Sequence, residues 1–484
     1  MEYSHSLKFS WRTKNGSREP SLSKEQGSKP VTASDEKTNV RQLAAEILSK
    51  VDTRKAYADI LLDSSMRSQP FDERDRGLLT EVVHGTLRWR GKIDGRLQPH
   101  LRRPLSEADP LIRNLLRLTL YQLLFLDKVP DYAAVNEAVE IAKKLQGSRA
   151  GGFVNGVLRN VLRQRDDRAQ PRLSNSSVAT LAQEYSHPQW LVEKWRDYFG
   201  SDEAIALMSA SNDQAPLVVR VNVRKISRDV LLTQLAENGI EALPTRNSPV
   251  GIWLKSAPAI DRIPGFAEGY FQVQGEASQL VSYLLDPQPN ERILDACAAP
   301  GGKATHVAEL MDDRGSVIAV DRSPSGIAKI NDNRSRLGLR SIEALCHDMG
   351  ETLPAALSTN YDRILVDAPC SGFGTLRSHP EIKWQRDQSD VKRLSALQRK
   401  ILNNASGYLK PGGVLVYSTC TLMAEENDEV VRRFLSEHDG FELEAAANYL
   451  PEPAKSLVQG KYFLALPHRD NSDGFFAARM RKVN

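Results

Sequence analysis

The sequence lacks the features of a membrane, secreted or zinc-binding protein. No stretch of the chain approaches the ~20 uncharged apolar residues that a membrane-spanning helix needs. The first residues, MEYSHSLKFSWR, are polar where a signal peptide is apolar. Only four cysteines occur, without a Cys-x-x-Cys pair or histidines at zinc-finger spacing. We therefore expect a cytoplasmic protein with no membrane contact, no disulfide framework and no metal site, and nothing in the sequence suggests more than a monomer.

Two common nucleotide-binding motifs are also absent. A P-loop requires Gly, four residues and then Gly-Lys-Ser/Thr, and a dinucleotide fold requires Gly-x-Gly-x-x-Gly. The glycine-rich segment Ala299-Pro-Gly-Gly-Lys303 is followed by Ala304 and fits neither pattern. These two classes of nucleotide site are therefore excluded.

Net charge is small but unevenly spread. The whole chain carries +4, whereas residues 38–165 contain 22 Lys and Arg against 15 Asp and Glu. A basic surface of this kind suits a phosphate-rich partner such as a nucleic acid, although a well-solvated helical surface is the plainer interpretation.

Hydrophobic periodicity divides the chain into four segments. Residues 1–37 are rich in Ser, Lys, Glu, Pro and Gly, which predicts a disordered tail. Residues 38–165 have a helical period, with Leu43, Ile47 and Val51 four residues apart. An apolar helix over 111–124 predicts the centre of a bundle, and Asp131 is predicted to cap a helix that ends at Gly147.

The second half of the chain mixes strands and helices. Residues 166–285 predict a small α+β domain, with helices over 187–199 and 230–238 and strands at 216–222, 252–254 and 270–273. In residues 286–484, short apolar runs alternate with helices, which favours an α/β domain with a parallel, doubly wound sheet. The runs are 291–296, 315–321, 341–348, 361–369 and 412–420, and residues 473–482 are predicted to form a final edge strand.

Candidate ligand-binding residues stand where these predicted strands end. Ligands bind beyond the carboxyl ends of parallel strands. The first strand runs into Asp295–Lys303, whose glycines permit a sharp turn before a helix. Asp321 ends the second strand 19 residues after Gly302, a separation typical of an acid that binds ribose hydroxyls, and Asp348 ends the third. A single aspartate of this kind is as often a helix cap, but together with the glycine turn they favour a nucleotide site.

The fourth and fifth strands each end near a cysteine. One ends in Asp367-Ala-Pro-Cys370 and the other in Ser418-Thr-Cys420. A lone cysteine at a strand end is usually structural. Two thiols beside an acid at one sheet edge instead indicate nucleophilic chemistry.

These motifs resemble those of the Nop2/Sun family of RNA cytosine-5 methyltransferases. The matching segments are DACAAPGGK (295–303), VDAPCSGFGTLRSHPEIKW (366–384) and YSTCTLMAEEN (417–427). Residues 38–165, particularly GGFVNGVLRNVLR, resemble the helical RNA-binding fold of the antitermination factor NusB. The resemblance covers all but the first residues. It implies a NusB-like all-α domain, a small α+β domain, and a Rossmann-like class I methyltransferase domain that uses S-adenosyl-L-methionine.

The resemblance also assigns roles to residues. Cys420 would be the nucleophile that adds to carbon 6 of cytosine, and Cys370 would assist release of the methylated product. Asp367 would bind the cytosine edge, and Lys303 is a possible source of positive field for the thiolate. The cofactor would be bound by Cys297, Ala298, Ala299, Pro300, Gly301, Gly302, Lys303, Asp321, Asp348 and Asp367. Arg377, His379, Lys383 and Trp384 would contact RNA, or else lie in a surface loop and the core.

The NusB-like segment favours 16S ribosomal RNA, free or within an assembling small subunit, as the substrate. Methylation of a tRNA and a non-catalytic role in ribosome assembly remain alternatives. A DNA cytosine methyltransferase is disfavoured, because those enzymes carry the nucleophile in the Pro-Cys motif. One departure stands out: the family linker usually contains Val-Gln-Asp, whereas this chain has Val273-Gln274-Gly275-Glu276, so Glu276 is a possible replacement for that aspartate.

Overall fold

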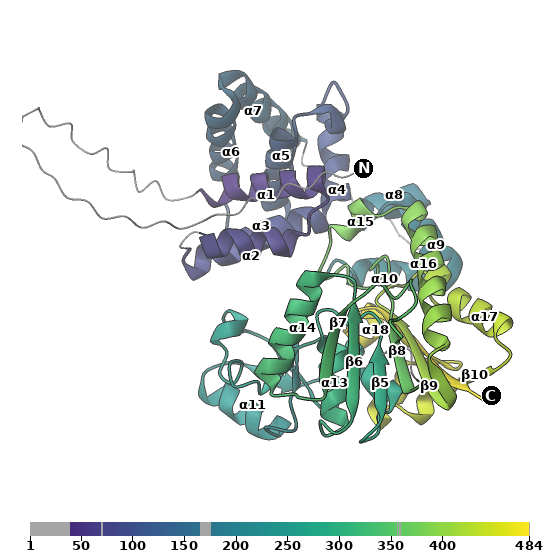
Figure 1. The fold of residues 1–484 in the computed structure, drawn as a ribbon. Helices are drawn as coiled ribbons and strands as arrows, with labels where there is room; N and C mark the ends of the chain where they lie inside the picture. The colour runs from purple at the N-terminus through teal and green to yellow at the C-terminus, as the bar shows by residue number, and fades with distance from the viewer. Residues whose placement is uncertain (1–38, 69–70, 165–175, 356, 358–359, 484) are drawn as a thin grey trace, which may run out of the picture. The chain divides into compact units, whose positions relative to one another are not determined.

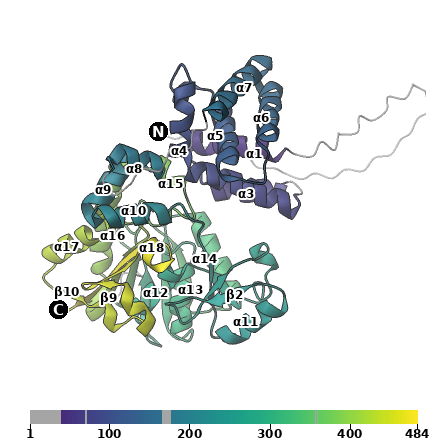
Figure 2. The same ribbon diagram turned by 180° about the vertical axis from the view of Figure 1, so that it is seen from behind.

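A computed structural model describes residues 39–68, 71–164, 176–355, 357 and 360–483. The predicted disordered tail, residues 1–37, lies outside this part of the chain. Within it, no helix is long and apolar enough to cross a membrane. Figures 1 and 2 show a helical domain, a small sheet and a larger sheet covered by helices.

The N-terminal domain is built from helices alone, as predicted. They are α1 (Val40–Arg54), α2 (Ala58–Ser68), α3 (Glu73–Arg88), α4 (Arg90–Leu97), α5 (Pro110–Phe125), α6 (Asp131–Gln146) and α7 (Ser148–Arg163). Their apolar faces form one buried cluster in which α5 contributes residues from almost its whole surface. The predicted capping role of Asp131 is wrong, because α6 starts at Asp131 itself and Pro130 occupies the N-cap position. The helix ends at Gln146, and Gly147 at its C-cap has the positive φ of 84° expected of a glycine that ends a helix.

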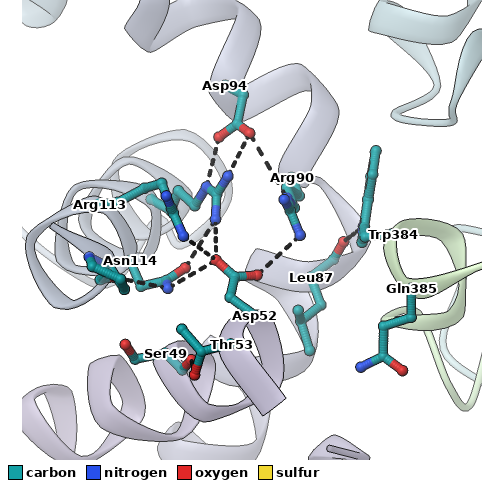
Figure 3. A network of polar contacts seen from close by, with 12 residues as sticks. Ser49, Asp52, Thr53, Leu87, Arg90, Asp94, Arg113, Asn114, Trp384 and Gln385 are labelled. Carbon is teal, nitrogen blue, oxygen red and sulfur yellow. Dashed lines mark hydrogen bonds and ion pairs between the residues drawn. The ribbon is translucent and has the colours of Figure 1, made fainter. Parts of the chain in front are cut away.

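A buried ion-pair network connects three helices of this domain (Figure 3). Arg117 on α5 forms two 2.7 Å bonds to Asp94 on α4 and a third to Asp52 on α1. Asp52 also accepts from Arg90 at 3.0 Å. These charges lower the pKa of Asp52 although its burial acts in the opposite direction.

The small α+β domain contains an antiparallel sheet with the order β2-β3-β1-β4. Its strands are β1 (Leu217–Val221), β2 (Ala242–Pro244), β3 (Gly251–Leu254) and β4 (Phe271–Val273), and helix α11 (Arg228–Glu237) packs on one face. The strands expected near 252 and 270 do not pair with each other. Each pairs with β1, which lies between them.

Helices α8 (Val178–Glu184), α9 (Gln189–Phe199) and α10 (Ser201–Ala210) precede this sheet in the chain. Their buried side chains do not join its core. Leu191, Trp195 and Leu207 pack instead into the apolar cluster of the C-terminal sheet. These three helices therefore pack with the C-terminal domain, although they precede its strands in the sequence.

The C-terminal sheet is parallel at its centre and antiparallel at one side, with the order β11-β12-β13-β9-β8-β5-β6-β7 and with β10 pairing to β13. The parallel strands are β5 (Arg292–Asp295), β6 (Ser316–Asp321), β7 (Ile342–Cys346), β8 (Tyr361–Asp367) and β9 (Leu409–Thr419). Strands β10 (Phe441–Glu444), β11 (Val458–Gln459), β12 (Tyr462–Ala465) and β13 (Phe475–Lys482) complete it. The five predicted parallel strands are confirmed. The prediction of an edge position for 473–482 is wrong, because β13 pairs with both β9 and β12.

Helices cover both faces of this sheet (Figures 1 and 2). One face packs against α12 (Glu276–Leu285), α13 (Gly302–Leu310) and α14 (Pro324–Leu337). The other packs against α16 (Gln388–Ser406) and α17 (Asp428–Glu437), together with α8 to α10. Both faces are apolar because both are buried, which explains the continuous hydrophobic runs in the sequence.

Candidate functional site

A sharp turn connects β5 to α13 at the carboxyl edge of the parallel strands. Gly301 has a φ of 100°, and a Cβ placed there would lie 3.2 Å from the Cα of Ile330. Glycine is therefore required at this position for both conformation and space. Gly302 is the first residue of α13, so the free N–H groups of that helix follow directly after the turn.

Asp321 and Asp348 stand beside this turn. Asp321 accepts from the amide of Ala299 at 3.1 Å and from that of Ser323 at 2.8 Å. Asp348 accepts from the amide of Gly350 at 2.8 Å. Helix α14 is capped by Ser323, not by Asp321, so the alternative interpretation of Asp321 as a helix cap does not hold. Both aspartates line a cavity of about 270 Å³.

The same cavity reaches the two predicted catalytic thiols. Cys370 and Cys420 line it together with Cys297 and Asp367, and the sulfur atoms of Cys370 and Cys420 are 3.3 Å apart. The pKa of the Cys370 thiol is raised well above its ordinary value. The hydrogen bond to Cys420 is the larger cause, and burial is the second. The sequence-based prediction that these cysteines meet at one edge of the sheet is confirmed by this geometry.

The loops carrying the thiols are held together by a buried carboxylate that the sequence did not single out. Glu426 accepts from the amide of Ser371 at 2.9 Å and from the side chain of Gln398 at 2.9 Å. The hydroxyls of Ser371 and Thr421 are 2.8 Å apart. One of these residues follows Cys370 and the other follows Cys420, so the bonds fix the separation of the two thiols.

Asp367 at the end of β8 has a partner on each oxygen. Lys303 Nζ lies 2.6 Å from one, and the hydroxyl of Ser418 donates to the other at 2.8 Å. Lys303 Nζ also lies 4.9 Å from the centre of the Phe475 ring. Its ion pair is thus with Asp367, and its predicted effect on the Cys420 thiolate stays a prediction.

A second cavity, of about 360 Å³, shares Cys297, Ala299 and Asp367 with the first, whereas the two thiols line only the first. We call the second one the catalytic cavity, because the predicted catalytic residues Asp367 and Lys303 line it. Lys303, Asp367 and Phe475 line it, as do Asp295 and Asp473. Asp295 is 1% exposed, and burial, reinforced by the charge of Asp367, raises its pKa to about 7. Sequence reasoning did not select Asp295 or Asp473. The position of Asp295 at the end of β5 was an available signal, whereas nothing local distinguishes Asp473.

Three of the four residues for which RNA contacts were considered form hydrogen bonds within the protein. Lys383 is fully buried and donates to Arg88 O at 2.8 Å and to Asn212 Oδ1 at 2.9 Å. Trp384 Nε1 donates to Leu87 O at 2.7 Å (Figure 3). Arg377, also buried, donates to Gln214 O at 2.8 Å and to Asn471 Oδ1 at 3.0 Å.

The fourth, His379, does line the catalytic cavity, and its Nδ1 lies 3.2 Å from Asp59 of α2. That bond raises the pKa of His379 despite its burial. The structure therefore favours the second alternative, a place within the protein, for Arg377, Lys383 and Trp384. They join the loop after β8 to α3, to α4 and to the segments that follow α10 and α18 (Pro467–Asp470). Of the four residues, only His379 lines either of these two cavities.

The unusual linker also has a structural explanation. Glu276 accepts from the amides of Asn247 and Ser248 at 2.5 and 2.9 Å, so its carboxylate supports the turn between β2 and β3. It does not replace a catalytic aspartate, and that suggestion is wrong. At Gly275, a Cβ would lie 3.6 Å from Oδ2 of Asp473. A carboxylate from a distant segment thus stands beside the glycine.

Comparisons with known proteins match the whole described chain. The family described as 16S rRNA methyltransferase RsmB/F matches residues 282–481, the NusB family matches 38–163, and an RsmF/B-like ferredoxin-like domain matches 187–261. The probable ribosomal RNA small subunit methyltransferase B of Bacillus subtilis is 40% identical over 447 residues, covering 92% of this chain and 99% of the relative. Ribosomal RNA small subunit methyltransferase B of Pectobacterium atrosepticum is 35% identical, with 92% and 99% covered.

Solved structures agree with these matches. The crystal structure of PH0851 has a TM-score of 0.78 and 27% identity, covering 92% of this chain and 99% of that chain. The structure of NSun6 from Pyrococcus horikoshii with SFG has a TM-score of 0.54 and 25% identity, covering 61% of this chain and 98% of that chain. The likeness to PH0851 extends over all three parts of the fold.

Proposed function

Because the chain belongs to the RsmB/F family of 16S rRNA methyltransferases, we propose that it methylates carbon 5 of a cytosine in 16S ribosomal RNA. The observation that carries the proposal is the pair of thiols, 3.3 Å apart, beside Asp367 and the cavity of Asp321 and Asp348. The curated relatives are named for the small-subunit ribosomal RNA, which supports the substrate class.

The residues of the cavity fit S-adenosyl-L-methionine. Asp321 and Asp348 offer carboxylate oxygens to ribose hydroxyls and to an adenine edge, and Gly301 lets the backbone approach the ligand. Asp295 offers a buried carboxylate near the same turn, suited to a cationic group. NSun6, a relative in fold, was solved with SFG, an analogue of this cofactor. When bound, S-adenosyl-L-methionine supplies an electrophilic methyl group.

Cys420 activates the cytosine. Carbon 5 is a poor nucleophile while the ring is aromatic. Addition of the Cys420 thiolate to carbon 6 breaks the conjugation and makes carbon 5 nucleophilic. Asp367 binds ring nitrogen 3 during this addition, and Lys303, 2.6 Å from its carboxylate, is the donor from which a proton reaches that edge.

Cys370 acts in release. After methylation, the carbon 5 proton passes to solvent and the double bond to carbon 6 re-forms. The bond between carbon 6 and the Cys420 sulfur breaks in the same step, so that Cys420 leaves as a thiolate. Because its pKa is raised, Cys370 remains a protonated thiol at neutral pH, 3.3 Å from that sulfur. It is thus placed to return a proton to the departing thiolate, which separates the roles of the two cysteines.

Substitution of each cysteine tests this assignment. Cys420→Ala should abolish both methylation and covalent RNA adducts, whereas Cys370→Ala should accumulate a protein–RNA adduct that survives denaturation. Gel electrophoresis and transfer of a labelled methyl group measure the two effects. The exposed Cys346→Ala serves as the control and should retain both activities. Exchanged phenotypes of the two variants would show that the roles are reversed.

The substrate is tested separately. Bisulfite sequencing of ribosomal RNA from cells with and without the gene should reveal one cytosine of 16S RNA that loses its methyl group. An unchanged 16S pattern together with a change in a tRNA would favour the tRNA alternative. No change in any RNA, with no adduct from Cys370→Ala, would favour a non-catalytic assembly factor.

A further inference from the structure

A third cavity lies next to the catalytic one and has no role in the mechanism above. Its volume is about 340 Å³, within the range of ligand sites. It is lined by the small sheet on one side and by residues 469–473 on the other. Gly275 and Asp473 line this cavity and also the catalytic cavity that contains Lys303 and Asp367. The two spaces are therefore neighbours with a shared wall.

The floor of this cavity is an apolar face of the small sheet. Val218, Trp253 and Leu243 stand in one row across β1, β3 and β2, because Val218 pairs with Trp253 and Trp253 pairs with Leu243. The alternate residues of β1 and β3, such as Val219 and Ile252, face the core under α11. The row is thus on the opposite face, and Leu243 is 43% exposed. An accessible indole in such a hollow is a stacking surface.

Cationic groups border this floor, while two of the three acids that line the cavity are engaged. Arg246 and Arg469 both line the cavity. Glu276 binds the 247–248 backbone, and Asp470 accepts from the amide of Leu466 at 2.8 Å. Arg469 pairs with Glu203 at 2.6 Å, whereas no ion pair involves the exposed Arg246 among the residues that the structure describes. Arg246 thus leaves a positive charge at the rim.

We propose that this cavity binds the base of a nucleotide that flanks the target cytosine, stacked on Trp253, with Arg246 on its phosphate. The proposal rests on the proposed function, since it requires an RNA substrate. An aromatic surface with adjacent arginines is how proteins hold unpaired RNA bases. A flipped-out cytosine in the catalytic cavity draws its neighbour along the backbone. The shared wall of Gly275 and Asp473 places the next hollow within reach of that neighbour.

Asp473 is the polar group positioned to contact this base. It forms part of the wall of both cavities, and its Oδ1 has no hydrogen-bond partner among the described residues. Burial raises the pKa of its carboxyl group, and a protonated acid donates a hydrogen bond as well as accepting one. Asp473 is accordingly a candidate for selecting which base occupies the hollow.

The test uses the full-length enzyme and an RNA fragment that contains the cytosine located by bisulfite sequencing. Trp253→Ala should raise the KM for this RNA about tenfold, the scale of one lost base stack, with kcat at saturating RNA unchanged. Trp253→Phe retains a flat ring and should stay near the wild type. Arg246→Ala should also raise the KM, whereas Arg262→Ala, an exposed arginine of the same domain away from the cavity, should not.

Abasic substitutions identify the occupant. Each nucleotide beside the target is replaced in turn by an abasic one. At one position only, the abasic replacement should weaken binding of the RNA to the wild-type enzyme. The same replacement should not weaken binding to Trp253→Ala any further, because that variant has already lost the stacking contact. Three results would each overturn the proposal. The first is that every abasic replacement weakens RNA binding by the same factor in the wild type and in Trp253→Ala. The second is an unchanged KM for RNA in Trp253→Ala, and the third is an effect of that substitution on the KM for S-adenosyl-L-methionine alone. If Cys370→Ala still forms its adduct, the proposed function stands whatever these results.

Discussion

At the residue scale, the site separates carboxylates by their environment. Asp367 has a lysine and a hydroxyl as partners, whereas Asp295 is buried nearby and its pKa is raised to about 7. Ionisation of a buried acid of this kind lowers the stability of the folded protein, unless a cationic ligand beside the carboxylate compensates for its burial. This pattern fits a residue reserved for the ammonium group of the cofactor.

Asp295→Asn should reduce the pH dependence of stability. The folded state retains a proton on Asp295 that the unfolded chain loses near pH 4, so the free energy of unfolding falls as pH rises from about 4 to about 7. A shift of this size corresponds to at most about 4 kcal/mol. The melting temperature should therefore drop more between pH 5 and pH 8 for the wild type than for the variant.

The exposed Asp202→Asn is a suitable control and should follow the wild type. Equal drops in the wild type and in Asp295→Asn would show that Asp295 ionises normally in the folded protein. S-adenosyl-L-methionine should raise the melting temperature of the wild type more than that of Asp295→Asn, because the variant lacks the carboxylate.

At the element scale, the short helix α15 (Ile382–Gln385) connects the catalytic loop to the N-terminal helices. Lys383 and Trp384 bind carbonyl groups at the end of α3, and Arg90 lies 5.3 Å from the Trp384 ring. Thr375 and His379, which line the catalytic cavity, lie in the same loop. The position of these cavity residues therefore depends on contacts made with the helical domain.

Trp384→Ala should loosen this connection. It removes a hydrogen bond and a partly buried ring, a loss of roughly 2–4 kcal/mol, equivalent to several degrees in melting temperature. Limited proteolysis should cut the loop between β8 and α16 faster than in the wild type. The partly exposed Tyr283 of α12 contacts His306, 5.3 Å away between ring centres, so Tyr283→Ala removes a ring elsewhere and should not affect the rate of cutting. An unchanged rate in Trp384→Ala would contradict the role of α15.

At the scale of the whole molecule, the positive charge lies in the helical domain and the chemistry in the C-terminal domain. Arg149 and Arg159 are exposed on α7. Phosphate contacts position an enzyme on RNA without reading its sequence. The helical domain thus suits the task of holding the RNA while the catalytic domain selects and modifies one base.

The double substitution of Arg149→Gln and Arg159→Gln should weaken RNA binding and make that binding less dependent on salt. Each lost phosphate contact should reduce the slope of log affinity against log salt by about 0.7 to 0.9. The rate at saturating RNA should be unchanged, because neither residue is near the thiols. A slope equal to that of the wild type, measured by filter binding between low and moderate salt, would exclude α7 from the interface.

Much of this arrangement was predictable because strand ends are visible in sequence. Asp321, Asp367, Cys370 and Cys420 each follow an apolar run, and parallel strands bring such ends to one edge. Trp253 and Asp473 could not be predicted, because they meet only through tertiary packing of separate segments. The two alternatives for Lys383 and Trp384 could not be separated for the same reason: the helix that they contact lies almost 300 residues earlier.

The central position of β13 has a consequence for how the protein is made. Strand β9 is synthesised well before β13, and its edge stays unpaired until β13 arrives with Asp473 and Phe475 of the cavity wall. The helical domain has its own core from residues 40–161 and is complete much earlier. During translation, the part that we propose holds RNA is therefore folded first. On this proposal, the growing chain is able to bind RNA before it is able to modify that RNA.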